Sequence, residues 1–227
     1  MNLFIDELIN MFLVILIILT VTMVSRRNLI SLINSYAFHS LSLSLVSFLF
    51  FLKDLDLIFL YTAVLTIISK SYLIPVLLKR TQKNMKIYTD VEYHYLQPIS
   101  SIFFSLLVII SAFFIFLEIK DYLDFVFSSY LGLVMGFSLV MIGFMIIFSR
   151  IKIITKIIGY LIMENGVVLL SLFIGEMPLL IEVLILMDLL VLVAITAILG
   201  FGMDSSLEDF HKRLNPFRKW FKKVVKE

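Results

Sequence analysis

The sequence predicts an all-α polytopic membrane protein of about seven transmembrane helices, followed by a C-terminal amphipathic helix. Of its 227 residues, 61% are hydrophobic and only 16% are charged, and its mean hydropathy is +1.08. A soluble globule needs far more polar surface than this composition provides. The apolar runs approach the ~20 residues that cross a hydrocarbon core of ~30 Å, and only helices satisfy the backbone of such runs in lipid.

The apolar runs indicate a transmembrane domain over residues 1–203 and a cytoplasmic tail over residues 204–227. The predicted spans are residues 4–24, 29–51, 57–78, 99–117, 125–148, 157–174 and 179–201. The first is interpreted as a retained helix and not as a signal peptide, because Asp6 and Glu7 replace a basic n-region. The tail combines aromatic and lysine residues at helical spacing, which favours an interfacial helix over a docking strap for a soluble partner.

The basic residues sort by connection, which predicts the orientation of the chain. Connections one, three and five and the tail carry 16 Lys and Arg residues, whereas the N-terminus and the other connections carry only Lys53 and Lys120. Because basic residues concentrate in cytoplasmic loops, we expect the N-terminus outside and the C-terminus in the cytoplasm. The predicted location is the cell (cytoplasmic) membrane.

An internal repeat is visible at a constant offset of 125 residues. Residues 27–34 can be laid over residues 152–159, and the same offset places His39 on Glu164 and Ser40 on Asn165. Both copies follow cytoplasmic basic loops, so they would be parallel repeats of three helices with the fourth span linking them.

Several classes of chemistry are excluded or disfavoured by residue content. The chain has no cysteine, which excludes thiolate-held iron–sulfur clusters, thiolate metal sites and disulfides. Its three histidines are scattered, so we expect no haem or zinc site on this chain alone. We therefore expect no cofactor, no metal, no nucleic-acid partner and no catalysis by this chain by itself.

Charged residues inside the spans are the candidate functional residues. Glu164, Glu182, Asp188 and Lys70 interrupt apolar runs, where a charge at the membrane centre costs at least ~2.5–3.5 kcal/mol on insertion scales. Such residues are usually paired, face the bundle interior or mark an ion path. His39, in the second span, could relay protons in the same path.

Each candidate also has a purely structural interpretation. Lys70 could snorkel to the interface, although ~12 Å is a long reach for its side chain. Glu182 lies one turn inside the outer end of its span, where water could reach it, and it faces a different side from Asp188. The serine-rich face around His39 could serve helix packing alone, and three glycines of the fifth span predict a close packing seam, namely Gly132, Gly136 and Gly143.

Four short motifs carry a resemblance to a known family: Arg26-Arg27-Asn28-Leu29-Ile30, Lys70 with Ile74-Pro75, Glu164-Asn165-Gly166, and Pro178 with Glu182 and Asp188. In this order and spacing they resemble the E component of hydrogenase-4, a membrane subunit of formate hydrogenlyase and related energy-converting nickel–iron hydrogenases. Each three-helix half is also similar to the K subunit of respiratory complex I and the C subunit of Mrp-type antiporters.

The resemblance implies a subunit without redox centres, beside antiporter-like membrane subunits and a hydrogenase peripheral arm, with intramembrane Glu and Lys as ion-path candidates. Two positions depart from the expected pattern. His39 stands where the family leads us to expect glutamine, and Leu161 stands where complex I would have a glutamate, with Glu164 one turn later. A proton path therefore cannot be copied directly from complex I.

Three functions are compatible with these features. The first is a proton- or sodium-translocating subunit of a hydrogenase-type complex, with Glu164 and Asp188 as relays and Lys70 as a cationic switch. The second is a scaffold subunit whose charges form static pairs. The third is an independent secondary transporter.

The charge sorting yields a topological prediction. Cysteines introduced into this cysteine-free chain at Lys83 and Lys120 should react with a membrane-impermeant reagent from opposite sides of the membrane. Labelling of both positions from the same side would contradict the seven-span arrangement.

Overall fold

The computed structural model describes residues 2–84, 97–123 and 127–174, and six separate positions beyond them: 187, 188, 190, 191, 193 and 195. The described part consists of helices joined by short connections. The helices are α1 (Asn2–Ser25), α2 (Leu29–Asp54), α3 (Leu57–Thr66), the π-helical segment η1 (Ile67–Leu73), α4 (Ile74–Asn84), α5 (Pro98–Leu123), α6 (Phe127–Ser149) and α7 (Ile153–Ile174).

Within the described residues, six helices are long and apolar enough to cross a membrane, which confirms the predicted helical membrane-protein class. They correspond to the first six predicted spans: Leu3–Ser25, Leu29–Asp54, Leu57–Lys83, Pro98–Glu118, Tyr130–Ser149 and Ile153–Ile174. The third helix continues well past its predicted end at residue 78, because Lys79, Arg80 and Lys83 extend it as the more polar α4. Residues 179–201 and 204–227 lie largely or wholly outside the described residues, although the six described positions of the former are helical.

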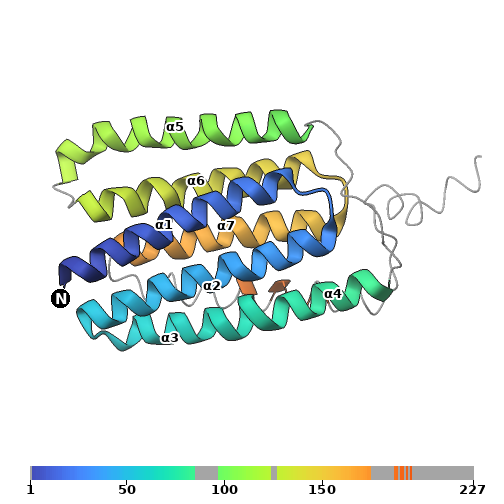
Figure 1. Ribbon diagram of the computed structural model, residues 1–227, viewed down its shortest axis with the longest axis horizontal. Coiled ribbons are helices and arrows are strands. Elements are labelled where there is room, and N and C mark those ends of the chain that lie inside the picture. Colours follow the sequence, from blue (N-terminus) through green and yellow to red (C-terminus); the bar gives the residue numbers. More distant parts are fainter. Residues whose placement is uncertain are drawn as a thin grey trace, which may run out of the picture.

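The helices form a bundle with two edges (Figure 1). α5 lies along one edge against α1 and α6, and the continuous α3–η1–α4 rod lies along the other edge against α2. Between them, α1 packs on α2 and α6, while α7 packs on α6 and α2. α2 and α7 are therefore the central pair, and most of their middle residues are buried.

Local sequence signals fix where the helices begin and end. The Asn28 side chain caps α2 by accepting hydrogen bonds from the N–H groups of Ile30 and Ser31 at 2.9 and 3.3 Å. Asp56 caps α3 in the same way through the N–H of Ile58 at 3.0 Å. Between these helices, Leu55 adopts a left-handed conformation with φ 55°, which ends α2 and reverses the chain within a few residues.

Glycines set the closest contact in the bundle, between α6 and α7. A Cβ atom on Gly143 would lie 2.6 Å from the backbone nitrogen of Met163 and 2.7 Å from the carbonyl oxygen of Gly159. A Cβ on Gly166 would lie 2.8 Å from the carbonyl oxygen of Gly136. These backbones approach closely because neither helix has a side chain there, so the predicted glycine packing seam is confirmed.

The serine-rich face of α2 also contributes to packing, as the sequence suggested. Ser47 donates a hydrogen bond to the carbonyl oxygen of Phe59 in α3 at 2.8 Å. In return, Ser71 of η1 donates one to the carbonyl oxygen of Ala37 in α2 at 3.3 Å. The hydrophobic effect contributes little to helix association within lipid, so such hydrogen bonds help to hold neighbouring helices together.

The glycine seam predicts a difference between two alanine substitutions in α6. Gly143→Ala should destabilise the folded protein by about 1–3 kcal/mol, because the new methyl group meets the backbone of α7, which cannot move alone. Ser138→Ala is the matched control in the same helix, because it adds no atom and removes a hydroxyl group that bonds to the carbonyl oxygen of Val134 in α6 itself at 2.7 Å. Thermal unfolding of the two purified variants measures the difference, and equal losses would contradict a backbone-limited seam.

Candidate functional site

The centre of the bundle holds a cluster of three charged side chains from three helical segments. The Nζ atom of Lys70, in η1, lies 3.0 Å from Oε1 of Glu164, in α7, and 3.7 Å from Oδ1 of Asp188, in the last described helical stretch. The shorter distance is that of a charge-assisted contact, whereas the longer one is an electrostatic contact without close approach. The ammonium group therefore sits between two carboxylates and is closer to one of them.

All three side chains are withdrawn from the protein surface. The exposed fraction is 2% for the Lys70 side chain, 3% for Glu164 and 9% for Asp188. Removing one member of a buried ion pair costs ~3–5 kcal/mol, because the partner keeps an uncompensated charge in a low dielectric. The snorkelling interpretation of Lys70 is thus wrong: its ammonium group points into the bundle and not toward the interface.

A π-helical turn positions Lys70. In η1 the N–H of Ile74 bonds to the carbonyl oxygen of Ser69, a spacing of five residues and not four. Pro75, which has no N–H to donate, follows immediately. The wider turn changes which residues face inward, so that Lys70 is buried while Tyr72 is 70% exposed. π-helical turns inside α-helices are often found at functional sites.

A second polar group lies at the interface of α2 and α7, one residue from Glu164. The Nδ2 atom of Asn165 lies 3.1 Å from Nδ1 of His39 and donates a hydrogen bond to Oγ of Ser40 at 3.1 Å. An amide nitrogen only donates, so Nδ1 of His39 is the acceptor and the proton of its neutral ring is on Nε2. All three side chains are fully buried.

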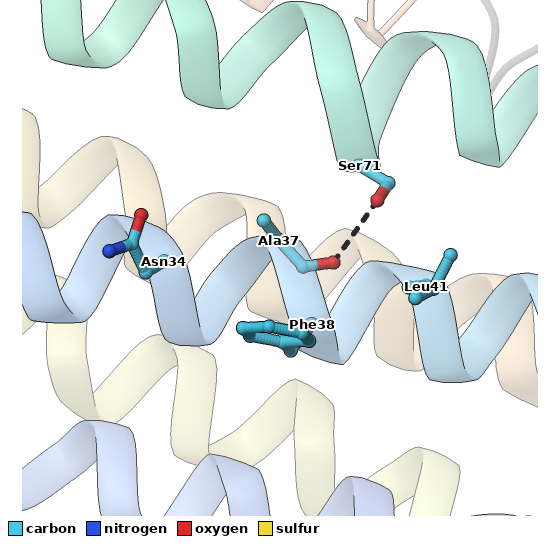
Figure 2. A pocket seen from close by; sticks show the side chains of 5 residues that line it. All are labelled: Asn34, Ala37, Phe38, Leu41 and Ser71. Carbon is cyan, nitrogen blue, oxygen red and sulfur yellow. Dashed lines mark hydrogen bonds between the residues drawn. The ribbon is translucent and has the colours of Figure 1, made fainter.

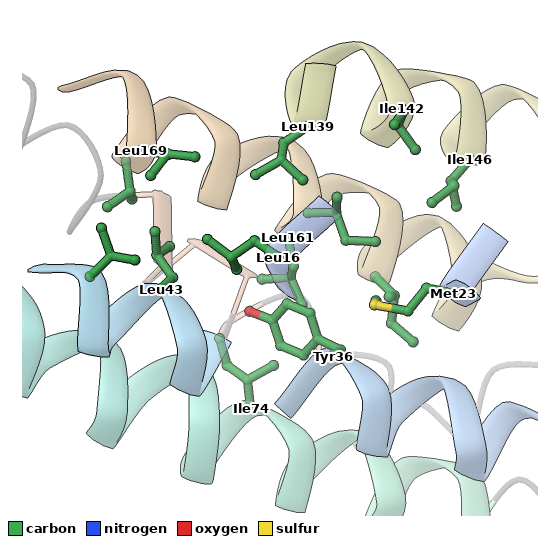
Figure 3. Close-up of a cluster of buried hydrophobic side chains, with 14 of the residues drawn as sticks. Leu16, Met23, Tyr36, Leu43, Ile74, Leu139, Ile142, Ile146, Leu161 and Leu169 are labelled. Carbon is green, nitrogen blue, oxygen red and sulfur yellow. The ribbon is translucent and has the colours of Figure 1, made fainter. Parts of the chain in front are cut away.

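Tyr36 belongs to the same interior and was not identified from the sequence. It lies three and four residues before His39 and Ser40, on the same face of α2, and it is fully buried. Figure 3 shows its ring among apolar side chains that include Leu161 and Ile74. Its hydroxyl group has no hydrogen-bond partner among the described residues, although the carboxylates of Glu164 and Asp188 are near enough to interact with it electrostatically. The spacing of three or four from His39 and Ser40 was the available signal.

The sequence-based candidates therefore fall into three groups. Lys70, Glu164 and Asp188 come together as one cluster, in which Asp188 is one of the two partners of Lys70. His39 is next to this cluster through Asn165, and Lys70 interacts with its ring electrostatically. Glu182 lies outside the described residues.

The described residues contain no group of three His, Asp or Glu side chains that could hold a metal ion. The chemistry available to the cluster is instead the movement of a proton or the exchange of a small cation between two carboxylates and an ammonium group. A histidine side chain in free solution accepts or releases a proton near neutral pH, and His39 adds such a group beside the cluster.

A shallow groove of about 240 Å³ lies on the opposite, outward face of α2, where α2 meets η1 (Figure 2). It is lined by Asn34, Ala37, Phe38, Leu41 and Ser71. The groove is mostly apolar, and a hydrogen bond joins two of its lining residues, Ser71 and Ala37 (Figure 2). It contains none of the charged cluster.

No protein-family model, no curated protein and no solved structure matches this chain.

Substitutions of two serines in α2 test whether the hydrogen bond between Ser40 and Asn165 contributes more to stability than a hydroxyl group that bonds within its own helix. Ser40→Ala should destabilise the protein by about 1–3 kcal/mol, because an N–H of Asn165 loses its buried acceptor on the other helix. Ser42→Ala is the control, because that hydroxyl group bonds only to the carbonyl oxygen of Phe38 in its own helix at 3.0 Å. Thermal unfolding of both purified variants gives the comparison, and a Ser42→Ala loss as large as that of Ser40→Ala would contradict a specific role for the link.

Proposed function

We propose that this chain is a membrane-arm subunit of a hydrogenase-type, ion-translocating complex and that it contributes a buried segment of the ion path. One observation carries the proposal: an ammonium group lies between two carboxylates in the interior of a bundle of apolar helices, at 3.0 and 3.7 Å. Ionisable groups in such a place are expensive, and in membrane proteins they mark ion and proton paths.

The roles follow from the geometry. Glu164 and Asp188 are the relay carboxylates, and Lys70 is the switch, because its ammonium group can shift from the nearer carboxylate to the farther one. A lysine side chain carries a compact charge on a flexible stem, which suits such a shift. His39 extends the path along α2: its Nδ1 atom is held by Asn165, and its Nε2 atom has no hydrogen-bond partner among the described residues.

The arrangement of helices supports the proposed pair of parallel three-helix repeats. At an offset of 125 residues, α6 is the counterpart of α1 and α7 is the counterpart of α2, and the members of each pair pack against each other. Ser40 and Asn165, which this offset superimposes, are joined by a hydrogen bond. We propose that residues 179–201 form the seventh span and third helix of the second repeat, with α5 linking the repeats, the N-terminus outside and the C-terminal tail in the cytoplasm.

The proposed partners follow from the family resemblance of the sequence, that of the E component of hydrogenase-4. They are antiporter-like membrane subunits and a hydrogenase peripheral arm. The described outer helices supply a suitable surface: on α5, large apolar side chains such as Phe103, Phe114 and Ile110 are 60%, 63% and 52% exposed. Either lipid or a neighbouring helix satisfies such a surface, so it accommodates the proposed partners without identifying them.

A scaffold role is the second candidate, and the 3.0 Å contact between Lys70 and Glu164 favours it. A close, buried ion pair can serve simply to fix the register of two helices. The third alternative, an independent transporter, requires a substrate cavity within the chain. The groove between α2 and η1 is lined by none of the three charged residues.

Conservative removal of the charges distinguishes an ion path from a static pair. Glu164→Gln keeps the shape of glutamate without its titrating proton, and Lys70→Met keeps the length of lysine without its charge. In an ion path, each variant should leave the complex assembled and lower ion uptake by about tenfold or more, as expected when a proton-transfer group that contributes 10²–10⁴-fold is lost. Ion uptake by membrane vesicles, normalised to assembled complex, is the measurement.

The controls use the same two substitutions elsewhere in the chain. Lys53→Met removes a lysine that pairs with Asp6 at 2.7 Å near the helix ends, and Glu118→Gln removes an exposed glutamate of α5. Both should pump normally. A static arrangement predicts that Lys70→Met fails to assemble, because it strands both carboxylates at a cost of ~3–5 kcal/mol, and that Glu164→Gln, in which Lys70 keeps Asp188 as its partner, pumps normally. Normal uptake in both cluster variants would remove Glu164 and Lys70 from the path.

The same membranes test the proposed partners. Purification through a tag on this chain should yield antiporter-like subunits and a hydrogenase arm at fixed stoichiometry. Recovery of the chain alone, active in transport, would favour the independent transporter.

A further inference from the structure

The numbers of positive and negative groups in the cluster indicate which ion the proposed path carries. Five charged side chains are buried among the described residues: Lys70, Arg150, Lys152, Glu164 and Asp188. Arg150 and Lys152 lie at the connection between α6 and α7, and Arg150 donates a hydrogen bond there to the carbonyl oxygen of Val24. Among the described residues, the central cluster therefore contains one positive group and two negative groups.

One excess negative charge is unfavourable in this environment. Lys70 can neutralise one carboxylate, and the other would remain charged in a bundle of apolar helices that lipid surrounds. A buried acid without a compensating charge binds a proton instead. The balance is restored by one additional cation, either a proton or a metal ion such as Na⁺.

The relation between the two acids favours the proton. Oε1 of Glu164 and Oδ1 of Asp188 lie 3.0 and 3.7 Å from the same ammonium nitrogen, so the two carboxyl groups are neighbours. Two ionised carboxylates only accept hydrogen bonds and repel each other, whereas a protonated one donates to its ionised neighbour. The contact therefore becomes favourable when the pair holds one proton.

The other titratable groups around the pair do not supply this charge. On α2, the Nδ1 atom of His39 accepts a hydrogen bond from Asn165, so its ring is neutral, and the phenol of Tyr36 is neutral when protonated. On α7, Tyr160 interacts electrostatically with both acids and is likewise neutral. On η1, Lys70 is the cation already counted.

A sodium ion fits this site less well. The Lys70 ammonium group lies between the two carboxylates, at 3.0 and 3.7 Å, where a cation shared by both would need to bind. No third acidic or histidine side chain joins these two as a metal ligand within the described residues. A hard metal ion prefers a larger shell of oxygen ligands than two carboxylates provide.

We infer that Glu164 and Asp188 share one proton in the resting state and that the ion relayed through this cluster is the proton and not Na⁺. This inference rests on the proposed ion path. In the relay, a proton binds to a carboxylate oxygen of one acid as the O–H bond of the other acid breaks and its proton leaves. The cluster then keeps one ammonium group, one carboxylate and one carboxylic acid throughout.

Infrared spectroscopy of membranes that contain the assembled complex tests the inference directly. The wild type should show the C=O stretching band of a buried carboxylic acid, shifted by exchange into D₂O. Glu164→Gln and Asp188→Asn should each abolish the band, because Lys70 then balances the single remaining carboxylate. Lys70→Met should increase it roughly twofold, because both acids must then be protonated to stay neutral. Glu118→Gln, which removes an exposed glutamate, should leave the band unchanged.

The ion is tested in the same membranes. Replacing Na⁺ with choline should change neither the band nor the proton uptake of vesicles. Absence of the band in the wild type, or uptake that requires Na⁺, would overturn the inference, and the wild-type measurement depends on no variant folding. The two proposals fail separately. If Glu164→Gln loses uptake but the wild type shows no band, the ion path is supported and the shared proton is contradicted. If the full band pattern appears but uptake in Glu164→Gln is normal, the shared proton is supported and the ion path is contradicted.

Discussion

The rest of this structure depends on the placement of one lysine ammonium group between two carboxylates inside an apolar bundle. Lys70, Glu164 and Asp188 come from η1, α7 and the last described helical stretch, so the cluster exists only when all three are packed together. Buried ion pairs rarely stabilise a fold relative to well-packed apolar side chains, because desolvation offsets their attraction. The packing around the cluster must therefore supply the stability that the cluster does not.

The surrounding helices provide that packing by close backbone contact. The glycine seam holds α7 against α6 through Gly143 and Gly159, which fixes the position of α7, and with it Glu164, relative to α6. On the other side, serine hydroxyl groups bond α2 to α3 and η1 to α2. The π-helical turn then aims Lys70 inward from a rod whose neighbouring side chains face outward. Each of these devices uses small or polar residues where an ordinary apolar span would carry larger ones.

The class of fold and the charged residues within the spans could be predicted from the sequence, but the contacts between those residues could not. Long apolar runs identify spans because a bilayer imposes both their length and their helical form. Charges within those runs stand out for the same reason, so Lys70, Glu164 and Asp188 could be selected without a structure. Their pairing could not, because it depends on how helices far apart in the sequence pack.

Two residues, Arg150 and Tyr36, show the same limit in detail. Arg150 lies in the connection between α6 and α7, as the charge sorting predicts, but it is only 3% exposed and donates a hydrogen bond to the carbonyl oxygen of Val24 in α1, which its place in a basic loop does not indicate. Tyr36 is a common aromatic residue in an apolar run, and nothing in its type distinguishes it from a core side chain. Only the neighbouring His39 and Ser40, at helical spacing, indicated its place.

The proposed repeat gives the cluster a further meaning. At an offset of 125 residues, the counterparts of Lys70, Glu164 and Asp188 are Ile195, His39 and Ala63. Ile195 and Ala63 are buried and apolar, and His39 is held neutral by Asn165. The two proposed repeats would thus share one set of charged residues and not carry one set each. Because Lys70 comes from the first proposed repeat and both acids from the second, the cluster would lie between the two repeats, where a relative movement of the two would change the distances on which the proposed proton transfer depends.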